Sequence, residues 1–364
     1  MKILHVESGM HLYGGALQVV FIMRGLKALG HHNVLACPTG SAIAQAGAEH
    51  AHVCAMQMTG DLDVALVGRL RRLIRAERPD VIHLHSRRGS DLWGALAGKL
   101  EGVPVVLSRR VDNPEHPLIV KLKYRLYDHV ITISEGIRQV LLAEGVPTAQ
   151  ITCVPSAVDT TLYQPDRSQL AGFRKTFSVA DDELTIGMVA QFIARKGHQT
   201  LLDALPAVLA AHPRTKILLF GQGPLWQQID ERVRQDPLLR QHVSLPGFRK
   251  DMAQILPCLD ILAHPASMEG LGVSLLQAAA CGLPLVGGRA GGIPEVIQVG
   301  LNGELIEPGD TAALAGHLQR LLSDPALRAR YGAAGRQWVE SRFSIDAMVR
   351  GNLAVYQRLT QSAK

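Results

Sequence analysis

The sequence predicts an α/β protein built of two consecutive doubly wound domains, and three observations lead to this fold class. Short apolar segments alternate with segments of helical length and periodicity, which is the pattern of a parallel sheet with crossover helices. The alternation weakens between residues 155 and 183 and then starts again, so the pattern occurs twice. The chain has 364 residues, with 35 glycines and only 4% aromatic residues, which suits two cores joined by many short connections.

The first half of the chain supplies the elements of the first domain. Residues 2–7 form the first expected strand, and residues 16–29 form a helix that Gly30 closes. Another helix is expected at residues 62–76, and further strands at residues 81–85, 104–108, 129–134 and 151–154. Ligands of parallel sheets collect at the carboxyl ends of the strands. The polar residues that follow these strand ends are therefore candidate site residues: His83, His85, Arg87, Arg88, Arg109, Arg110 and Glu135.

The second half of the chain repeats this order of elements. Strands are expected at residues 185–189, 216–220 and 261–263, and helices at residues 197–211, 224–234, 273–281 and 344–359. The aperiodic stretch between the halves contains an acidic cluster and two prolines, which is typical of a domain junction. We expect one domain at residues 1–165, a second at 166–345 and a C-terminal helix at 346–364.

The stretch from residue 264 to residue 295 carries the strongest signal for a ligand site. A buried strand ends there, a loop with Gly270 and Gly272 follows, and a helix begins near Val273. The free N–H groups of a helix start suit an anionic oxygen such as that of a phosphate. Glu269 stands beside that site as an acceptor for hydroxyl groups. An anion together with a polyol describes a nucleotide sugar.

This stretch resembles the E-x7-E region of retaining GT-B glycosyltransferases of the family 4-like type, also called glycosyl transferases group 1. Glu269 matches the first acid of that region, and Gln277 stands where the second acid is usual. The resemblance implies two Rossmann-like domains that face each other across a cleft, with the C-terminal helix returning to the N-terminal, acceptor-side domain. It also implies transfer of a sugar from a nucleotide sugar to a glycan or glycolipid with retained anomeric configuration, in lipopolysaccharide or polysaccharide biosynthesis.

The resemblance also assigns donor-site roles. Lys196 matches a lysine that contacts the donor diphosphate, Gln191 stands where the family commonly has an arginine, and Arg195 is the residue that would supply the missing charge. Cations beside a leaving diphosphate do the work that a metal ion does elsewhere, so neither a metal nor another cofactor is expected. The expected donor-binding residues are Gly14, Gly15, Gln191, Gly221, Gly247, Phe248, Gly270, Leu271, Gly272 and Gln277, with Gln277 facing the nucleotide ribose.

Two residues of the first half join Glu269, Lys196 and Arg195 as candidates for catalysis. The family often has a histidine after the strand that corresponds to residues 104–108, and Arg110 falls near that position in this chain. His85 follows the preceding strand, where several polar residues converge. A structural role remains the alternative for His85, and a turn-only role for the glycines that follow strands.

Charge points to an anionic acceptor. The net charge is +6, and Lys121, Lys123 and Arg125 interleave cations with apolar residues as an interfacial membrane helix does. We therefore expect an anionic glycan or glycolipid acceptor and peripheral contact with an anionic membrane. No nucleic-acid module is recognisable in the sequence, so no nucleic-acid partner is expected. Five scattered cysteines and an N-terminus unlike a signal peptide predict a cytoplasmic location, at the cytoplasmic face of the inner membrane.

A catalytically silent subunit that binds a sugar nucleotide or a glycan is the alternative function. Gln191 and Gln277, which replace charged residues of the family pattern, favour it. The intact Glu269 and Lys196 and the Gly14–Gly15 pair favour an active transferase. Release of nucleotide from a donor in the presence of an acceptor distinguishes the two.

Overall fold

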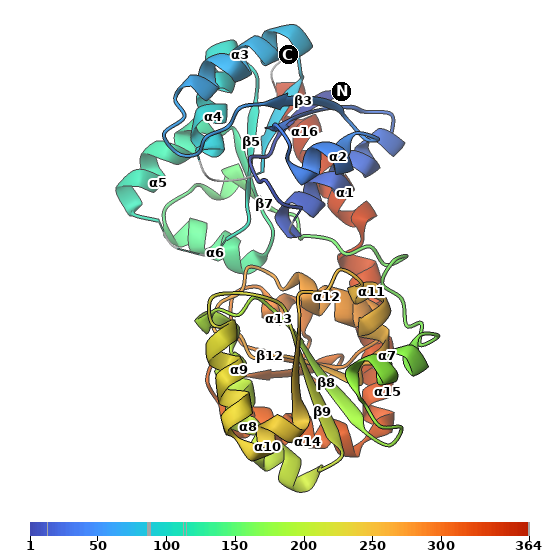
Figure 1. Ribbon diagram of the computed structural model, residues 1–364. Helices are drawn as coiled ribbons and strands as arrows, with labels where there is room; N and C mark the ends of the chain where they lie inside the picture. Colours follow the sequence, from blue (N-terminus) through green and yellow to red (C-terminus); the bar gives the residue numbers. More distant parts are fainter. Residues whose placement is uncertain (13, 86–88, 112, 114, 363–364) are drawn as a thin grey trace. The chain divides into compact units, whose positions relative to one another are not determined.

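The protein was analysed as a computed structural model that describes residues 1–364 except 13, 86–88, 112, 114, 363 and 364. The chain forms two compact units (Figure 1). Unit 1 consists of Met1–Ala157 together with Ile345–Lys364, and unit 2 of Val158–Ser344. The sequence pattern placed the first domain boundary at residue 165, whereas in the structure the first unit ends at Ala157. The C-terminal segment is part of unit 1.

Unit 1 is organised around a seven-stranded sheet in which all paired strands are parallel. The strand order is β3-β2-β1-β4-β5-β6-β7, so the direction of winding reverses between β1 and β4. A reversal of this kind opens a crevice at the carboxyl ends of the two strands. The strands are β1 (Lys2–Val6), β2 (His32–Pro38), β3 (His52–Met56), β4 (Val81–Leu84), β5 (Val105–Arg109), β6 (His129–Thr132) and β7 (Ile151–Cys153). The sequence pattern did not predict β2 and β3.

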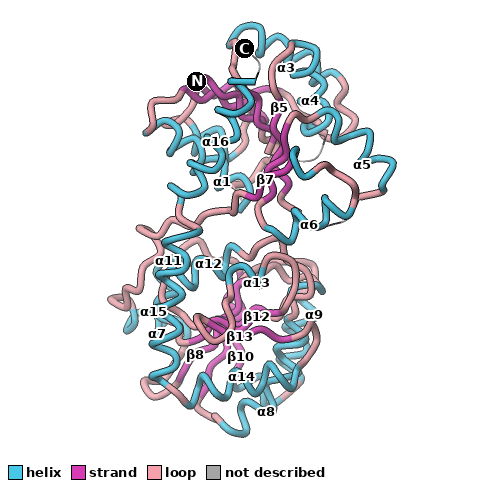
Figure 2. The backbone as a smooth tube through the Cα atoms, turned by 180° about the vertical axis from the view of Figure 1, so that it is seen from behind, coloured by secondary structure: helices cyan, strands magenta, loops and turns pink. Residues whose placement is uncertain are grey.

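Helices cover both faces of this sheet. They are α1 (Gly14–Ala28), α2 (Ala42–Gly47), α3 (Ala65–Glu77), α4 (Ser90–Glu101), α5 (Pro117–Lys123), α6 (Glu135–Ala143) and the C-terminal α16 (Ile345–Ser362). The C-terminal helix α16 lies beside α1 (Figure 2), and the buried side chains of Ile22, Val349 and Tyr356 share one apolar cluster. Gly14 and Gly15 are the first residues of α1 and not a separate loop before it.

Unit 2 contains a second sheet, of six strands in the order β10-β9-β8-β11-β12-β13, again with parallel pairings. The strands are β8 (Leu184–Val189), β9 (Thr215–Phe220), β10 (Val243–Gly247), β11 (Ile261–His264), β12 (Leu285–Gly288) and β13 (Gly303–Ile306). The winding reverses between β8 and β11. The loops that follow these two strands are therefore expected to frame a binding site.

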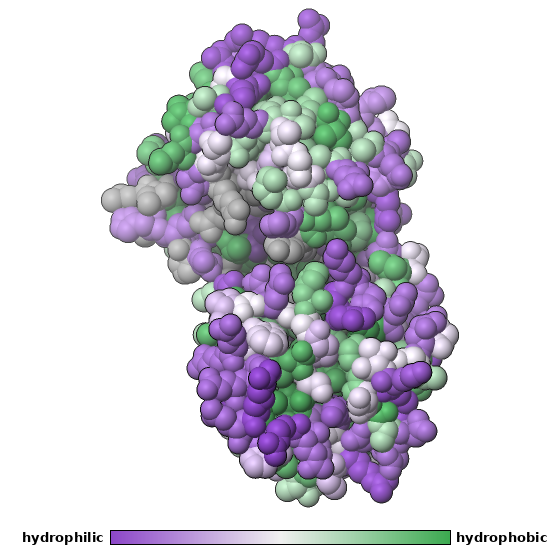
Figure 3. Space-filling view, in the orientation of Figure 1, coloured by the Kyte–Doolittle hydropathy of each residue, from purple (hydrophilic) through white to green (hydrophobic). Residues whose placement is uncertain are grey.

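Nine helices of unit 2 are described. They are α7 (Leu170–Phe177), α8 (His198–Ala211), α9 (Trp226–Gln235), α10 (Pro237–His242), α11 (Met252–Ile255), α12 (Val273–Ala280), α13 (Ile293–Val296), α14 (Thr311–Ser323) and α15 (Pro325–Arg342). Ile229 and Val233 of α9 are buried in the main apolar core of the unit, whereas the remainder of that helix is mostly polar. The space-filling view shows the outer side of α9 as a hydrophilic strip (Figure 3).

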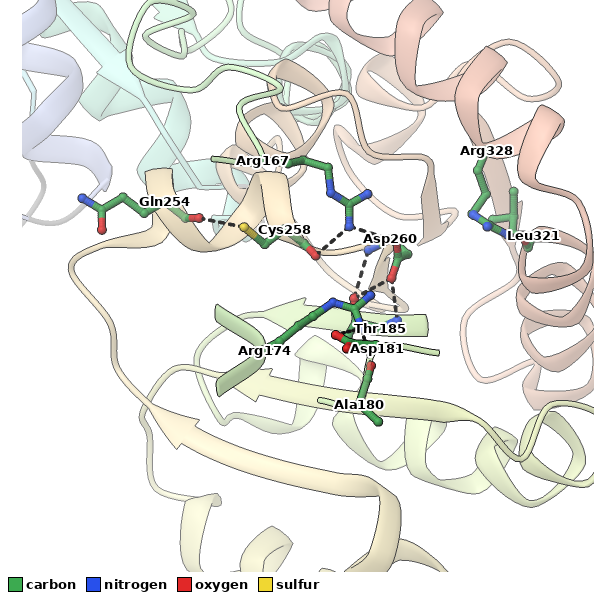
Figure 4. A network of polar contacts seen from close by, with 10 residues as sticks. All are labelled: Arg167, Arg174, Ala180, Asp181, Thr185, Gln254, Cys258, Asp260, Leu321 and Arg328. Carbon is green, nitrogen blue, oxygen red and sulfur yellow. Dashed lines mark hydrogen bonds and ion pairs between the residues drawn. The ribbon is translucent and has the colours of Figure 1, made fainter. Parts of the chain in front are cut away.

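Polar contacts explain why residues 158–183 belong to unit 2. The Arg167 guanidinium donates to the carbonyl of Cys258 at 3.2 Å and to the carboxylate of Asp260 at 3.3 Å. Asp260 also accepts hydrogen bonds from the backbone N–H of Thr185 at 2.8 Å and from its hydroxyl at 2.9 Å (Figure 4). These contacts tie the segment before β8 to the start of β11. The weak periodicity of this segment marks an irregular connection within the unit, and not the boundary itself.

The described residues include no helix with the length and apolar content that a membrane span requires.

We predict that Asp260→Ala lowers the free energy of unfolding of unit 2 by about 2–3 kcal/mol, because it leaves the buried N–H and hydroxyl of Thr185 without their acceptor. Asp181→Ala is the matched control, since Asp181 is fully exposed and pairs only at 3.5 Å with Arg174. Loss of the Asp181 carboxylate should lower the free energy of unfolding by less than about 0.5 kcal/mol. Urea unfolding followed by tryptophan fluorescence measures the free energy of unfolding of both variants, because Trp226 and Trp338 lie in unit 2. Equal urea midpoints for the two variants would contradict this role of Asp260.

Candidate functional site

Glu269 is the centre of the candidate site, in the loop between β11 and α12 of unit 2. Its Oε2 atom lies 2.5 Å from Nζ of Lys196 and 2.9 Å from Nε2 of His264, and Oε1 accepts the N–H of Gly270 at 3.1 Å. The side chains of Lys196 and Glu269 are 12% and 16% exposed, so this ion pair is only narrowly open to solvent. The two expected residues Lys196 and Glu269 are thus brought into direct contact.

The carboxyl group of Glu269 is held in its ionised form. Burial alone would raise its pKa, but the hydrogen bond and charge of His264 and those of Lys196 outweigh burial and lower the pKa to about 2. Glu269 is therefore a pure hydrogen-bond acceptor throughout the physiological pH range. A carboxylate with this property is suited to bind hydroxyl groups and unsuited to act as a general acid.

Backbone contacts bring the loops that follow β8, β11 and β12 together. The N–H of Ser267 donates to the carbonyl of Arg195 at 2.9 Å, and the N–H of Gly292 donates to the carbonyl of Glu269 at 3.1 Å. Gly197 has φ +80°, and a Cβ atom placed there would lie 2.0 Å from the carbonyl oxygen of Pro265. Only glycine permits this approach. The position of Lys196 relative to Glu269 therefore depends on the glycine that follows the lysine.

Arg195 contributes a second cation beside this ion pair. Its guanidinium lies 3.4 Å from the sulfur of Met268, and its side chain is partly buried. The helix α12 begins directly after this loop, with Gly272 at its N-terminal cap and φ +93°. The unpaired N–H groups of the first turn of a helix, together with two cations, provide an environment that suits an anion.

The other expected donor-site residues of α12 and its loop differ in their surroundings. Leu271 is buried, and Gly270 is partly exposed. Gln277 lies in α12 and is partly exposed, and its side-chain amide makes no hydrogen bond to another described residue. Gly272 is the N-terminal cap of α12, and Gln277 lies within the helix.

The glycine that follows β9 and the glycine that ends β10 have different surroundings. A Cβ atom at Gly221, which has φ +138°, would lie 1.9 Å from the carbonyl oxygen of Ala190. Gly247, which has φ +77°, has open space where a Cβ would be, and the next residue, Phe248, is 53% exposed. Gln191 is also exposed. Of these loops, the one that contains Gly247 and Phe248 presents free surface, whereas Gly221 is used for close packing.

His85 is buried and Arg110 is partly buried in unit 1, and Arg110 lies close to the start of α1. Nε2 of His85 lies 3.0 Å from Nδ1 of His5, and its own Nδ1 has no hydrogen-bond partner among the described residues. Burial, reinforced by the neighbouring His83 and His5 and by Arg110, holds the pKa of His85 well below its usual value, so the ring is neutral. Burial also lowers the pKa of Arg110 to about 10, against the opposing attraction of Glu7, so the guanidinium keeps its charge.

The glycine pair at the start of α1 lies against this arginine. A Cβ atom at Gly15 would be 3.6 Å from Cδ of Arg110, and a Cβ at Gly14 would meet nothing within 4 Å. The Nε atom of Arg110 is buried and has no hydrogen-bond partner among the described residues. Gly14, Gly15, His85 and Arg110 therefore gather at the carboxyl edge of the sheet of unit 1.

Two basic residues that the sequence placed on accessible surfaces are in fact turned inward. Arg109 is 2% exposed and forms an ion pair with Glu115 at 3.4 Å. Lys123 pairs with Asp91 at 2.8 Å and with Glu115 at 3.3 Å. The expectation that both face a ligand or a membrane was wrong, because nearby carboxylates compensate these charges within the fold. Arg87 and Arg88 lie outside the described residues.

Two groups of side chains within the described part of the chain could hold a metal ion, and both are in unit 1. One is the buried trio His5, His83 and His85, in which His83 already contacts the hydroxyls of Tyr356 and Ser108 at 2.5 and 2.9 Å. The other is the trio His52, Cys54 and Glu77, in which Lys2 pairs with Glu77 at 3.2 Å. Internal partners thus occupy ligand atoms in both groups.

His264 is the site residue that sequence reasoning missed. It is the last residue of β11, and its side chain is 1% exposed. The pattern of a histidine five residues before a carboxylate is not by itself informative. The available signal was its position at the carboxyl end of a central strand.

Comparison with known families and structures agrees with this architecture. Residues 13–162 match the family model Glycosyltransferase Family 4, and residues 172–338 match the family model Glycosyl transferases group 1. The two matched segments lie in the first and second halves of the chain. The gap between them falls within the aperiodic stretch that precedes β8.

Two characterised relatives show the extent of the similarity. A GDP-mannose-dependent alpha-(1-6)-phosphatidylinositol monomannoside mannosyltransferase of Mycolicibacterium smegmatis is 31% identical over 222 residues, which cover 58% of this chain and 57% of that enzyme. The chain thus spans little more than half the length of this relative. N-acetyl-alpha-D-glucosaminyl L-malate synthase of Bacillus anthracis is 26% identical over 312 residues, which cover 83% of this chain and 81% of the synthase.

A solved structure extends the comparison to the whole fold. Anabaena HepE, determined in complex with UDP and glucose, aligns with a TM-score of 0.83 and 22% identity, over 98% of this chain and 99% of HepE. At this identity the likeness concerns the fold. The protein accordingly has the GT-B fold of two Rossmann-like domains, and its two halves match Glycosyltransferase Family 4 and Glycosyl transferases group 1.

Proposed function

We propose that the protein is a glycosyltransferase that moves a sugar from a nucleotide-sugar donor to a glycan or glycolipid acceptor with retention of anomeric configuration. The observation that carries this proposal is the ionised Glu269 held beside Lys196 and next to the start of α12. An acceptor for hydroxyl groups beside a cationic site for a diphosphate fits a nucleotide sugar. The two family models and the names of the relatives support the same reaction class.

The donor is assigned to unit 2. Lys196, Arg195 and the first-turn amides of α12 bind the diphosphate, and Glu269 accepts hydrogen bonds from hydroxyl groups of the donor sugar. Gln277 reaches the ribose, where an amide can both donate and accept. The exposed loop of Gly247 and Phe248 lies against the nucleobase. Gln191, which is exposed and uncharged, adds at most a hydrogen bond to the phosphates.

The chemistry is assigned to a same-face displacement. The bond between the anomeric carbon and the diphosphate oxygen breaks, and its electron pair leaves with the diphosphate. The acceptor hydroxyl oxygen bonds to the same face of that carbon, and its proton passes to the departing phosphate oxygen. Lys196 and Arg195 stabilise the negative charge that develops, which requires no metal ion. Glu269 is not assigned as a nucleophile, because both of its oxygens are engaged with protein groups.

The acceptor is assigned to unit 1, at the edge where Gly15, His85 and Arg110 gather. The Nε atom of Arg110, which is buried and has no partner among the described residues, favours an anionic group on the acceptor. The neutral ring of His85 is suited to hydrogen-bond a hydroxyl group. The competing function, a catalytically silent binding subunit, would use the same contacts without transfer.

We predict that a nucleotide or nucleotide sugar raises the melting temperature of the protein in a screen of UDP, GDP, UDP-glucose, UDP-N-acetylglucosamine and GDP-mannose. A ligand at 100 times its Kd stabilises the native state by about 2.7 kcal/mol. Lys196→Ala should weaken binding of the matching nucleoside diphosphate about 10- to 150-fold, the worth of a charged hydrogen bond. Glu269→Ala should abolish transfer.

The control for this experiment is Lys175→Ala, which removes an exposed lysine of α7 in the same unit. Unchanged nucleotide affinity in Lys196→Ala would overturn the diphosphate assignment. Nucleotide binding without nucleotide release, in the presence of a lipid or polysaccharide acceptor that supports transfer by related enzymes, would favour the silent subunit.

We further propose that the acceptor lies at an anionic membrane surface, which the exposed part of α5 and the turn after it contacts. Lys121 and Arg125 are exposed, and Leu122 between them is 72% exposed. Cations that flank an apolar side chain are typical of an interfacial contact. Lys123 takes no part, because its ammonium group is paired with Asp91 and Glu115.

We predict that cosedimentation with vesicles containing phosphatidylglycerol falls as salt rises, and that Lys121→Gln with Arg125→Gln weakens it by about 1 kcal/mol per charge. Lys175→Gln with Arg240→Gln is the matched control, since both residues are exposed in unit 2. Equal losses in the two double variants would show a general charge effect. Equal binding to neutral phosphatidylcholine vesicles would contradict the anionic surface.

A further inference from the structure

His264 is a buried histidine that contacts the central carboxylate of the proposed donor site. Its Nε2 atom lies 2.9 Å from Oε2 of Glu269, and its side chain is 1% exposed. Because the carboxylate is ionised and can only accept, the hydrogen atom of this contact belongs to the histidine. His264 ends β11 and Glu269 follows five residues later, so the contact spans the loop that carries the site.

The same carboxylate oxygen is shared with Lys196. Lys196 Nζ lies 2.5 Å from Oε2, whereas the proposed function requires this lysine to bind the donor diphosphate. A diphosphate carries more negative charge than one carboxylate, so it competes for the ammonium group. When the lysine turns to the diphosphate, Glu269 keeps two protein donors, the Gly270 N–H on Oε1 and His264 on Oε2.

We propose that His264 is the positioning residue for Glu269: it holds the carboxylate toward the hydroxyl groups of the donor sugar while Lys196 binds the diphosphate. This inference rests on the proposed function for the identity of the ligand. The contact itself is a property of unit 2. The role predicted for His264 is exerted on the sugar through Glu269 and does not involve the nucleotide.

Burial makes this contact necessary. A partly buried carboxylate tends to become protonated, which would turn an acceptor of hydroxyl hydrogens into a donor. At Glu269, His264 contributes most to lowering the pKa against the effect of burial, and Lys196 contributes next. If Lys196 is engaged by the diphosphate, His264 is the group that keeps Glu269 ionised.

A second buried histidine, His198, lies near His264. His198, the first residue of α8, stacks on Phe192 with ring centroids 4.2 Å apart, and it is close enough for the charge of His264 to lower its pKa further after burial. Both ring nitrogens of His198, and Nδ1 of His264, are buried without a hydrogen-bond partner among the described residues.

The test compares His264→Leu, which cannot donate, with His264→Gln, whose amide nitrogen lies near the place of Nε2. With the donor that the screen identifies, kcat/KM should fall about 10- to 100-fold in His264→Leu and recover to within about fivefold in His264→Gln. The Kd of the nucleoside diphosphate without the sugar should change by less than about threefold, because the role acts on the sugar. His242→Leu is the control for removing a buried histidine of unit 2, whose Nδ1 bonds to the carbonyl of Thr215.

A double-mutant cycle separates positioning from packing. In the Glu269→Ala background, His264→Leu should have no further effect on donor binding, because the group that it positions is gone. A merely structural role would instead lower affinity by the same factor in both backgrounds. Equal factors, or the same loss for UDP or GDP as for the complete nucleotide sugar, would overturn the proposal.

A readout without ligand distinguishes failure of this inference from failure of the proposed function. The carboxyl ¹³C resonance of Glu269 is identified by its loss in Glu269→Gln, and its pH titration is followed in the free protein. The midpoint should rise in His264→Leu and return toward the native value in His264→Gln. An unchanged midpoint overturns the role of His264 whether or not any donor binds. If no nucleotide binds while the midpoint rises, the proposed function fails, and the contact between His264 and Glu269 remains supported.

Discussion

The site in unit 2 depends on one buried ion pair, that of Lys196 with Glu269, and on the histidine that shares it. A charge removed from water is costly unless donors or counterions replace the solvent. Here the Glu269 carboxylate, which is 16% exposed, accepts hydrogen bonds from the ammonium of Lys196, the imidazole N–H of His264 and the backbone N–H of Gly270. Such a group is rigid and ionised before any ligand arrives, so little reorganisation is needed when a polyol replaces the remaining solvent.

The ion pair in turn depends on how closely the loops after β8 and β11 approach. Gly197 lies against Pro265, and the backbone of Ser267 is bonded to that of Arg195. A side chain at Gly197 would push these loops apart and lengthen the contact between Lys196 and Glu269. The strand order supplies the reason that these loops meet, because β8 and β11 are neighbours in the sheet at the point where the winding reverses.

Much of this arrangement was accessible from the sequence. The alternation of apolar and helical segments predicted the strands β1, β4 to β9 and β11 and six of the helices within a few residues. Glu269 and Lys196 were predicted as site residues from their motif context. The strands β2, β3, β12 and β13 were missed. The segment 158–183 was taken for a junction, because irregular chain can also be packed by polar contacts such as Arg167 with Asp260. Side-chain contacts such as His264 with Glu269 and Lys123 with Asp91 have no signature in local periodicity.

The two units differ in whether their buried polar groups have hydrogen-bond partners, and this difference bears on their proposed roles. In unit 2 the Glu269 carboxylate is satisfied by protein groups on both oxygens. In unit 1 the guanidinium of Arg110 and the ring of His85 each retain a buried nitrogen with no partner among the described residues. Unmatched buried donors are costly unless a ligand or water completes them. This difference favours a donor site that is already formed in unit 2 and an acceptor edge in unit 1 whose polar groups are completed by the acceptor itself.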